Sequence, residues 1–154
     1  MSSMAVIQDF LAQKHIAVVG VSHDPEELSR MLVRTFRERG CEVYAVNPAM
    51  QSVDDSRCYA SLRDIGQPVD GVLVMTSPAA TDEVVRQCAE LHIPRVWMYR
   101  AGGRGAVSPQ AVEYCEDHGI AVVPGECPYM FLSGESWFHK LHGFVRRITG
   151  AYPA

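Results

Sequence analysis

The stretch IAVVGVSHDPEELS, residues 16–29, decides the fold of this 154-residue chain. Its first part, Ile16–Val21, is an apolar run interrupted only by Gly20, and a short polar loop follows. A run without polar alternation is typical of a strand that is buried on both faces of a parallel sheet. Helical periodicity then continues over Ser29–Arg39 and ends at Gly40. The stretch therefore predicts a buried strand, a tight turn and a helix.

The same alternation of apolar runs and amphipathic stretches continues along the chain. Further strands are predicted at Glu42–Val46, Gly71–Met75, Arg95–Tyr99 and Ile120–Val123, with a short edge strand at Arg57–Ala60. Helices are predicted at Met4–Gln13, Pro78–Leu91, Pro109–Gly119 and Ser136–Thr149, with a helical turn at Ser61–Ile65. This alternation predicts a single α/β domain over residues 1–154, built on a doubly wound parallel sheet with an extra C-terminal amphipathic helix. Right-handed crossovers favour the spatial order 2-1-3-4-5 for its five main strands.

Composition argues against several classes of protein. A net charge of −4 does not provide the basic face that a nucleic-acid binder needs. No apolar run reaches the ~20 residues of a membrane span, and the first residues lack a signal-peptide pattern. The five cysteines form no Cys-x-x-Cys pair, as expected for reduced thiols. We therefore expect a cytoplasmic protein that binds neither nucleic acid nor membrane.

The turn after the first strand is a candidate phosphate site. In such sheets ligands bind outside the carboxyl ends of the strands, at the switch point, which here lies between the first and third main strands. Gly20 would let the backbone approach an oxyanion, and the helix start would supply free N–H groups. The dinucleotide pattern Gly-x-Gly-x-x-Gly is absent, and the second strand ends in Asn47 and Pro48 rather than in an acidic residue. These features disfavour NAD, and the absence of a P-loop pattern disfavours ATP, while a tight turn that binds nothing remains the alternative.

A resemblance to a known family narrows the ligand. The residues that carry it are Val18-Val19-Gly20-Val21-Ser22, Asp24-Pro25, Ser29, Val46-Asn47-Pro48, Tyr59 to Ile65, Pro68-Val69-Asp70, Val96-Trp97-Met98 and Cys127. In this order they resemble the small stand-alone coenzyme A-binding proteins, whose Rossmann-like domain is related to that of succinyl-CoA ligases. The resemblance covers roughly residues 16–127.

The resemblance implies coenzyme A, or an acyl-CoA, as the ligand. The implied pyrophosphate site consists of the amides of Gly20, Val21 and Ser22, with His23 and Ser29 at the helix start. The nucleotide end is expected near Asn47 and Pro48, and the rest of the ligand near Thr76, Ser77 and Pro78.

Two departures from the family pattern concern charge. Glu26 and Glu27 stand where many members carry a basic residue, so one phosphate partner is missing. After the fourth main strand, many members carry glutamine, serine and glycine. This chain has Tyr99-Arg100-Ala101-Gly102-Gly103 there instead. Arg100 or Arg104 is our candidate for the missing cation, because a guanidinium group suits phosphate.

Cys127 and the last predicted helix allow other functions. Cys127 follows the fifth main strand, where a thiol could face a ligand or could be a buried structural residue. The helix at 136–149 places Trp137, Leu141 and Phe144 on one stripe, which favours packing on the sheet or on a second subunit in a homodimer. His139 and His142 lack accompanying ligands, so we expect no metal site.

Three functions therefore compete. The first is a coenzyme A-binding module without chemistry of its own. The second is an enzyme or redox protein that uses Cys127 or His23 on an acyl-CoA or other nucleotide, or an NAD(P)-binding oxidoreductase-like subunit. The third is an interaction subunit with a vestigial pocket.

Overall fold

The strand predicted from the deciding stretch lies at the centre of the sheet. The computed structural model describes residues 3–101 and 105–132, and in it this strand is β1 (His15–Val19). It pairs in parallel with β2 (Glu42–Val46) on one side and β5 (Gly71–Val74) on the other. The strand ends at Val19 rather than at Val21, because Gly20 has a φ of +95°, which leaves the extended conformation.

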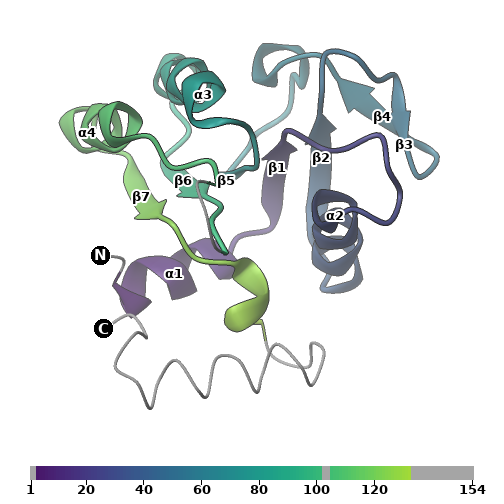
Figure 1. The fold of residues 1–154 in the computed structure, drawn as a ribbon, viewed down its shortest axis with the longest axis horizontal. Helices are drawn as coiled ribbons and strands as arrows, with labels where there is room; N and C mark the ends of the chain where they lie inside the picture. Colours follow the sequence, from purple (N-terminus) through teal and green to yellow (C-terminus); the bar gives the residue numbers. More distant parts are fainter. Residues whose placement is uncertain (1–2, 102–104, 133–154) are drawn as a thin grey trace.

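The sheet has seven strands in the spatial order β3-β4-β2-β1-β5-β6-β7 (Figure 1). Its remaining members are β3 (Ser52–Val53), β4 (Ser56–Tyr59), β6 (Arg95–Met98) and β7 (Ala121–Pro124). The five main strands thus follow the order 2-1-3-4-5, which confirms the predicted doubly wound α/β fold. All of their pairings are parallel.

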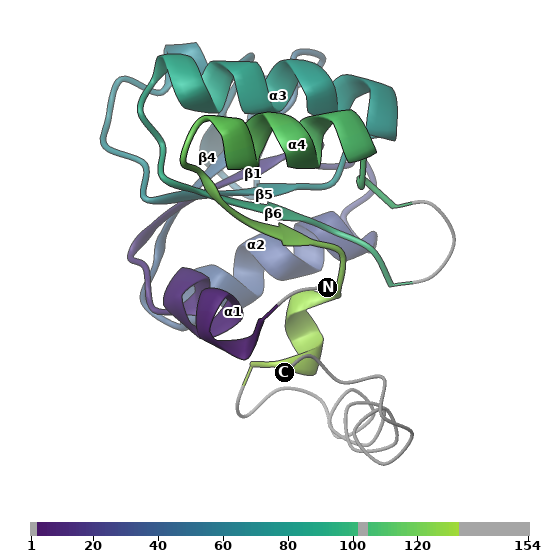
Figure 2. The same ribbon diagram turned by 90° about the vertical axis from the view of Figure 1, so that its left-hand side faces the viewer.

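Helices cover both faces of the sheet (Figure 2). One face carries α1 (Met4–Leu11) and α2 (Leu28–Glu38), and the other carries α3 (Pro78–Glu90) and α4 (Pro109–Asp117). Ser77 and Ser108 cap α3 and α4, and the helices begin at Pro78 and Pro109, the residues at which they were predicted to begin. Two 3₁₀ turns complete the described fold: η1 (Leu62–Asp64), close to the predicted helical turn, and η2 (Pro128–Met130).

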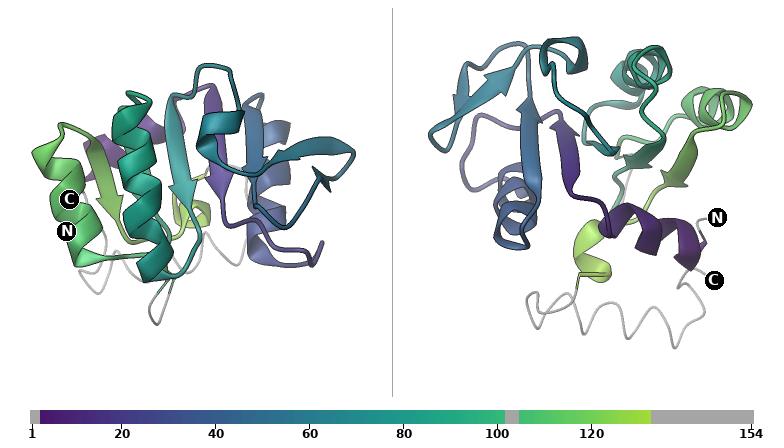
Figure 3. Two further views of the ribbon diagram at one scale, coloured as in Figure 1. Left: turned by 90° about the horizontal axis from the view of Figure 1, so that it is seen from above. Right: turned by 180° about the vertical axis from the view of Figure 1, so that it is seen from behind.

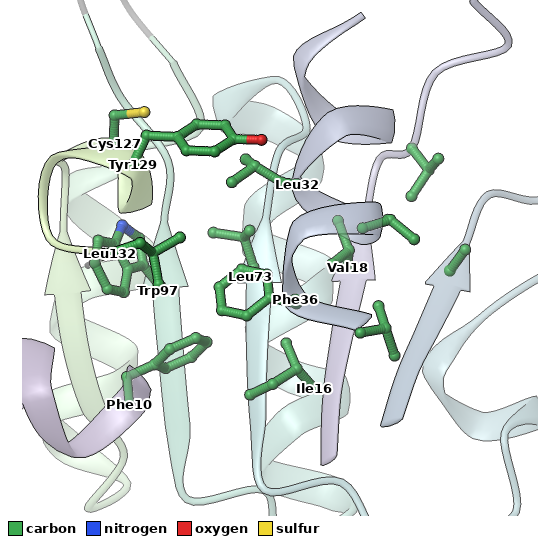
Figure 4. Close-up of a cluster of buried hydrophobic side chains, with 14 of the residues drawn as sticks. Phe10, Ile16, Val18, Leu32, Phe36, Leu73, Trp97, Cys127, Tyr129 and Leu132 are labelled. Carbon is green, nitrogen blue, oxygen red and sulfur yellow. The ribbon is translucent and has the colours of Figure 1, made fainter. Parts of the chain in front are cut away.

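A core of large side chains fixes the face that carries α1 and α2 (Figure 4). Trp97 is fully buried on this face and contacts Phe10 edge-to-face, with ring centroids 5.4 Å apart. The indole N–H of Trp97 donates to the carbonyl of Glu126 at 3.0 Å. The one polar atom of this side chain is therefore satisfied in the apolar layer.

The β3–β4 hairpin extends the sheet beyond β2 (Figure 3). The edge strand β4 was predicted to within one residue, but β3 was not predicted. Asp54 and Asp55 form the turn with φ of 48° and 66°, the combination that a two-residue type I′ hairpin requires. An Asp-Asp pair is a weaker hairpin signal than Asn-Gly or Asp-Gly, which explains why β3 was not predicted.

The predicted helix at 136–149 and the proposed homodimer contact through it lie outside the described residues, as does Arg104.

Candidate functional site

A pocket of about 330 Å³ lies at the carboxyl edge of the sheet, at the switch point between β1 and β5. Four separate parts of the chain line it: the ends of β1 and β2, the segment after β4, and α3 with the residue before its cap. The lining residues are Val19, Gly20, Val46, Asn47, Pro48, Ala60, Ser61, Leu62, Thr76, Ala80, Glu83, Val84 and Gln87. The position agrees with the rule that places ligands in the crevice of an open α/β sheet.

Gly20 brings the end of β1 against the end of β5. A Cβ atom on Gly20 would lie 2.8 Å from both the carbonyl carbon and the carbonyl oxygen of Met75. The positive φ of this residue is also rarely adopted by residues with a side chain. Glycine is therefore required here by the packing of the sheet edge itself, in addition to any space that a ligand would need.

Asn47 connects the pocket wall to the loop after β1. Its Nδ2 donates to the carbonyl of Val21 at 2.7 Å, and its Oδ1 accepts from the amide of Ala49 at 2.8 Å. The side chain therefore orders two backbone segments at the pocket rim. Pro48, next to it, is exposed on that rim.

Several amides in the segment from β1 to the start of α2 donate to side chains of the same segment. The amide of Ser22 donates to Ser29 Oγ at 2.9 Å, and the amide of Ser29 donates to Glu27 Oε2 at 2.9 Å. The hydroxyl of Ser29 donates to the same carboxylate oxygen. Glu27 is thus the N-cap of α2, and both polar groups of Ser29 face its carboxylate.

A buried cation lies behind this loop and was not predicted. Arg30 is 6% exposed, and its Nη1 donates to the carbonyls of Ser22 and His23, each at 3.3 Å. Its Nη2 pairs with Asp54 of the β3–β4 turn at 2.8 Å. The sequence places Arg30 within a predicted helix and gives no sign that its side chain is buried. The partner of Arg30, Asp54, lies in the β3–β4 turn, and β3 was not predicted.

Asp54 is shared between two arginines. Arg34 Nε also reaches its carboxylate, at 3.1 Å. Partial burial tends to raise the pKa of Asp54, but the hydrogen bonds and charges of Arg30 and Arg34 outweigh it and hold that pKa below its ordinary value. The ionised carboxylate therefore ties the hairpin to α2 and to the loop before it.

Comparison with known proteins decides the family. Residues 14–133 match the model of a family described as a CoA binding domain. The chain belongs to this CoA-binding family. It is 29% identical over 126 residues to the uncharacterized protein YneT of Bacillus subtilis, covering 81% of this chain and 90% of that protein.

Longer relatives carry the same domain as one part. The chain is 25% identical over 126 residues to the alpha subunit of ADP-forming acetate–CoA ligase II from Pyrococcus furiosus, but it spans 27% of that subunit's length. Among solved structures, a hypothetical protein from Pyrococcus horikoshii is similar with a TM-score of 0.75 at 26% identity, covering 83% of this chain and 92% of that one. The resemblance seen in the sequence is therefore confirmed at the level of the family and the fold.

Four of the residues predicted from the family pattern line the pocket: Gly20, Asn47, Pro48 and Thr76. Ser77 and Pro78 lie beside it as the cap and first residue of α3. Val21 is buried in the core, and His23 is exposed on the loop. The amide of Ser22 donates to the hydroxyl of Ser29 across the loop.

Arg100 is not among the residues that line the pocket. It is exposed after β6, and its backbone amide donates to the carbonyl of Glu126 at 3.2 Å. In the described structure, Arg30 and Arg34 contact the loop after β1 instead: the guanidinium group of Arg30 donates to the carbonyls of Ser22 and His23, and that of Arg34 donates to the carbonyl of Pro25.

Cys127 is 5% exposed and lies with Tyr129 at one end of the apolar cluster (Figure 4). Burial, followed by the charges of Cys127 and Glu27, raises the pKa of Tyr99 to about 12. Tyr99 packs against the apolar cluster that contains Cys127, on the face that carries α1 and α2. Among the residues that the structure describes, no group of three or more His, Cys, Asp or Glu side chains could hold a metal ion. No helix within this part of the chain is long and apolar enough to cross a membrane.

Proposed function

We propose that this protein is a cytoplasmic binding module for coenzyme A or an acyl-CoA. The observation that carries the proposal is the pocket between β1 and β5 in a chain that belongs to the CoA-binding domain family. The segments around Gly20, Asn47 and Thr76 are distant in sequence, and all three border this pocket.

The lining suits the nucleoside end of such a ligand. Val46, Leu62 and Val84 offer apolar surface for a flat base, while Asn47 and Ser61 offer polar groups. A volume of about 330 Å³ lies at the small end of the range for ligand pockets, which is about 300–1,000 Å³. In this proposal the base fills the pocket, and the pantetheine arm extends past Thr76 and the start of α3.

The test is a comparison of coenzyme A with NADH. A ligand that binds only the folded state stabilises it by about 2.7 kcal/mol when its concentration is a hundred times the dissociation constant. We expect coenzyme A to raise the melting temperature, and NADH to leave it unchanged, because the second strand ends without an acidic partner for a ribose. Calorimetry gives the affinity directly, and mass spectrometry of ligand released from the purified protein identifies what is bound. Stabilisation by NADH but not by coenzyme A would overturn the assignment.

A further inference from the structure

The position in which a ligand phosphate would meet the start of α2 is taken by the protein's own carboxylate. Glu27 Oε2 accepts both the amide and the hydroxyl of Ser29. Ser29 Oγ in turn accepts the amide of Ser22. A phosphate that approached this loop would need the same N–H and O–H groups, so it and Glu27 cannot both be bound by them.

The surroundings of the loop independently indicate an anion site. Arg30 is 6% exposed, and its Nε is buried without a hydrogen-bond partner among the described residues. Its Nη1 bonds to the carbonyls of Ser22 and His23, so the positive charge is directed at the loop from behind. Arg30 and Arg34 share the single carboxylate of Asp54, which leaves one positive charge in this trio uncompensated.

The carboxylate of Glu27 can be displaced from Ser29. Glu27 is exposed, so its carboxylate can rotate into solvent and bond to water. Ser29 is only 1% exposed, so its amide and hydroxyl then need another acceptor, and a ligand phosphate would supply one. The N–H groups that Glu27 releases are the donors that favour anions at a helix start.

We propose that Glu27 is an internal competitor for the phosphate of the ligand and sets the affinity of the site. The inference rests on the proposed binding of coenzyme A and adds a specificity-determining residue to it. In the free protein the Glu27 carboxylate caps α2, and in the complex the ligand phosphate replaces it on Ser29.

The matched pair Glu27→Gln and Glu26→Gln tests the proposal. Each variant removes one negative charge from the same exposed loop. Glutamine at position 27 keeps an oxygen that can cap Ser29, so the fold is preserved, which the melting temperature without ligand checks. The side chain of Glu26 has no hydrogen bond or ion pair within the described structure, so its variant reports the general effect of charge alone.

We expect Glu27→Gln to bind coenzyme A about fivefold more tightly than the wild type, and Glu26→Gln to change affinity less than twofold, by calorimetry in one buffer. Nuclear magnetic resonance should also show the amide signals of Ser22 and Ser29 shifting when coenzyme A is added. If the two variants bind coenzyme A with equal affinity, Glu27 has no special role. That result would overturn this inference but leave the proposed function standing. Failure of all three proteins to bind coenzyme A would overturn the proposed function and this inference together.

Discussion

At the scale of single residues, Gly20 shows how one position can meet two requirements. The family pattern suggests that this glycine makes room for a phosphate, and on that basis a bulky replacement should abolish binding while the sheet still forms. The structure adds that any Cβ here would meet the backbone of Met75. Loss of binding in a Gly20 variant would therefore not separate a ligand contact from a damaged sheet edge.

We predict that Gly20→Ala destabilises the protein by about 2 kcal/mol or more beyond the effect of Gly40→Ala. The two glycines have nearly the same positive φ, +95° and +92°, which a residue with a side chain rarely adopts, so alanine is strained at both positions. They differ in space, because a Cβ on Gly40 would meet no atom within 4 Å. Urea denaturation of both variants measures the difference, and equal losses would show that the contact with Met75 relaxes freely.

At the scale of secondary-structure elements, α3 offers a cleaner test of the pocket. Ala80 lines the pocket and Ala79 does not, although both are exposed residues in the first turns of the same helix. We predict that Ala80→Phe fills the pocket and lowers the affinity for coenzyme A by tenfold or more, while Ala79→Phe has little effect. Calorimetry measures both affinities, and melting temperatures confirm that both proteins fold. Unchanged binding by Ala80→Phe would show that the nucleoside lies elsewhere.

The β3–β4 hairpin marks the limit of what the sequence could predict about elements. Continuous apolar runs identified every main strand, since burial on both faces leaves a strong signal. Its first strand, β3, has no such signal, because it is two residues long and its Asp-Asp turn is a weak hairpin signal. Asp54 in that turn pairs with Arg30 and Arg34, which are distant in sequence. The same pairs explain why Arg30 was missed as a site residue. Arg100 was chosen because it lies in a segment that departs from the family pattern.

We predict that Asp54→Asn lowers the free energy of unfolding at neutral pH by about 1–2 kcal/mol, while Asp55→Asn changes it little. Both residues have positive φ in the same turn, but only Asp54 pairs with arginines in the described structure. Because the folded state lowers the pKa of Asp54, its contribution is complete above the unfolded pKa and is lost as pH falls through the folded one. The difference between wild type and Asp54→Asn should therefore shrink below about pH 4, measured by urea titrations at several pH values. A difference that does not change with pH would assign the effect to shape rather than charge.

At the scale of the whole molecule, the sequence predicted the topology and the edge of the sheet at which the pocket lies, because both follow from the order of strands and helices. It could not predict which groups at that edge bond to one another. The sequence showed that Glu27 stands where many family members carry a basic residue. It could not show that Glu27 accepts from Ser29, because that bond depends on the exact path of the loop. The cysteines illustrate the same limit, because their accessibility is a property of three-dimensional packing.

The final prediction concerns the five cysteines in the folded protein. Cys41 is the most accessible, being half-buried, whereas Cys58, Cys88, Cys115 and Cys127 are buried. Burial also raises the pKa of the Cys88 thiol, and it raises that of Cys115 to about 12, so neither forms the reactive thiolate readily. We therefore expect a thiol reagent, or coenzyme A disulfide, to label Cys41 first and the other four only as the protein opens. Peptide mass spectrometry after brief exposure, compared with Cys41→Ser and Cys127→Ser variants, measures the order. Rapid labelling of Cys127 that coenzyme A prevents would contradict this expectation. It would place a thiol at the ligand and restore the alternative of a protein with redox chemistry.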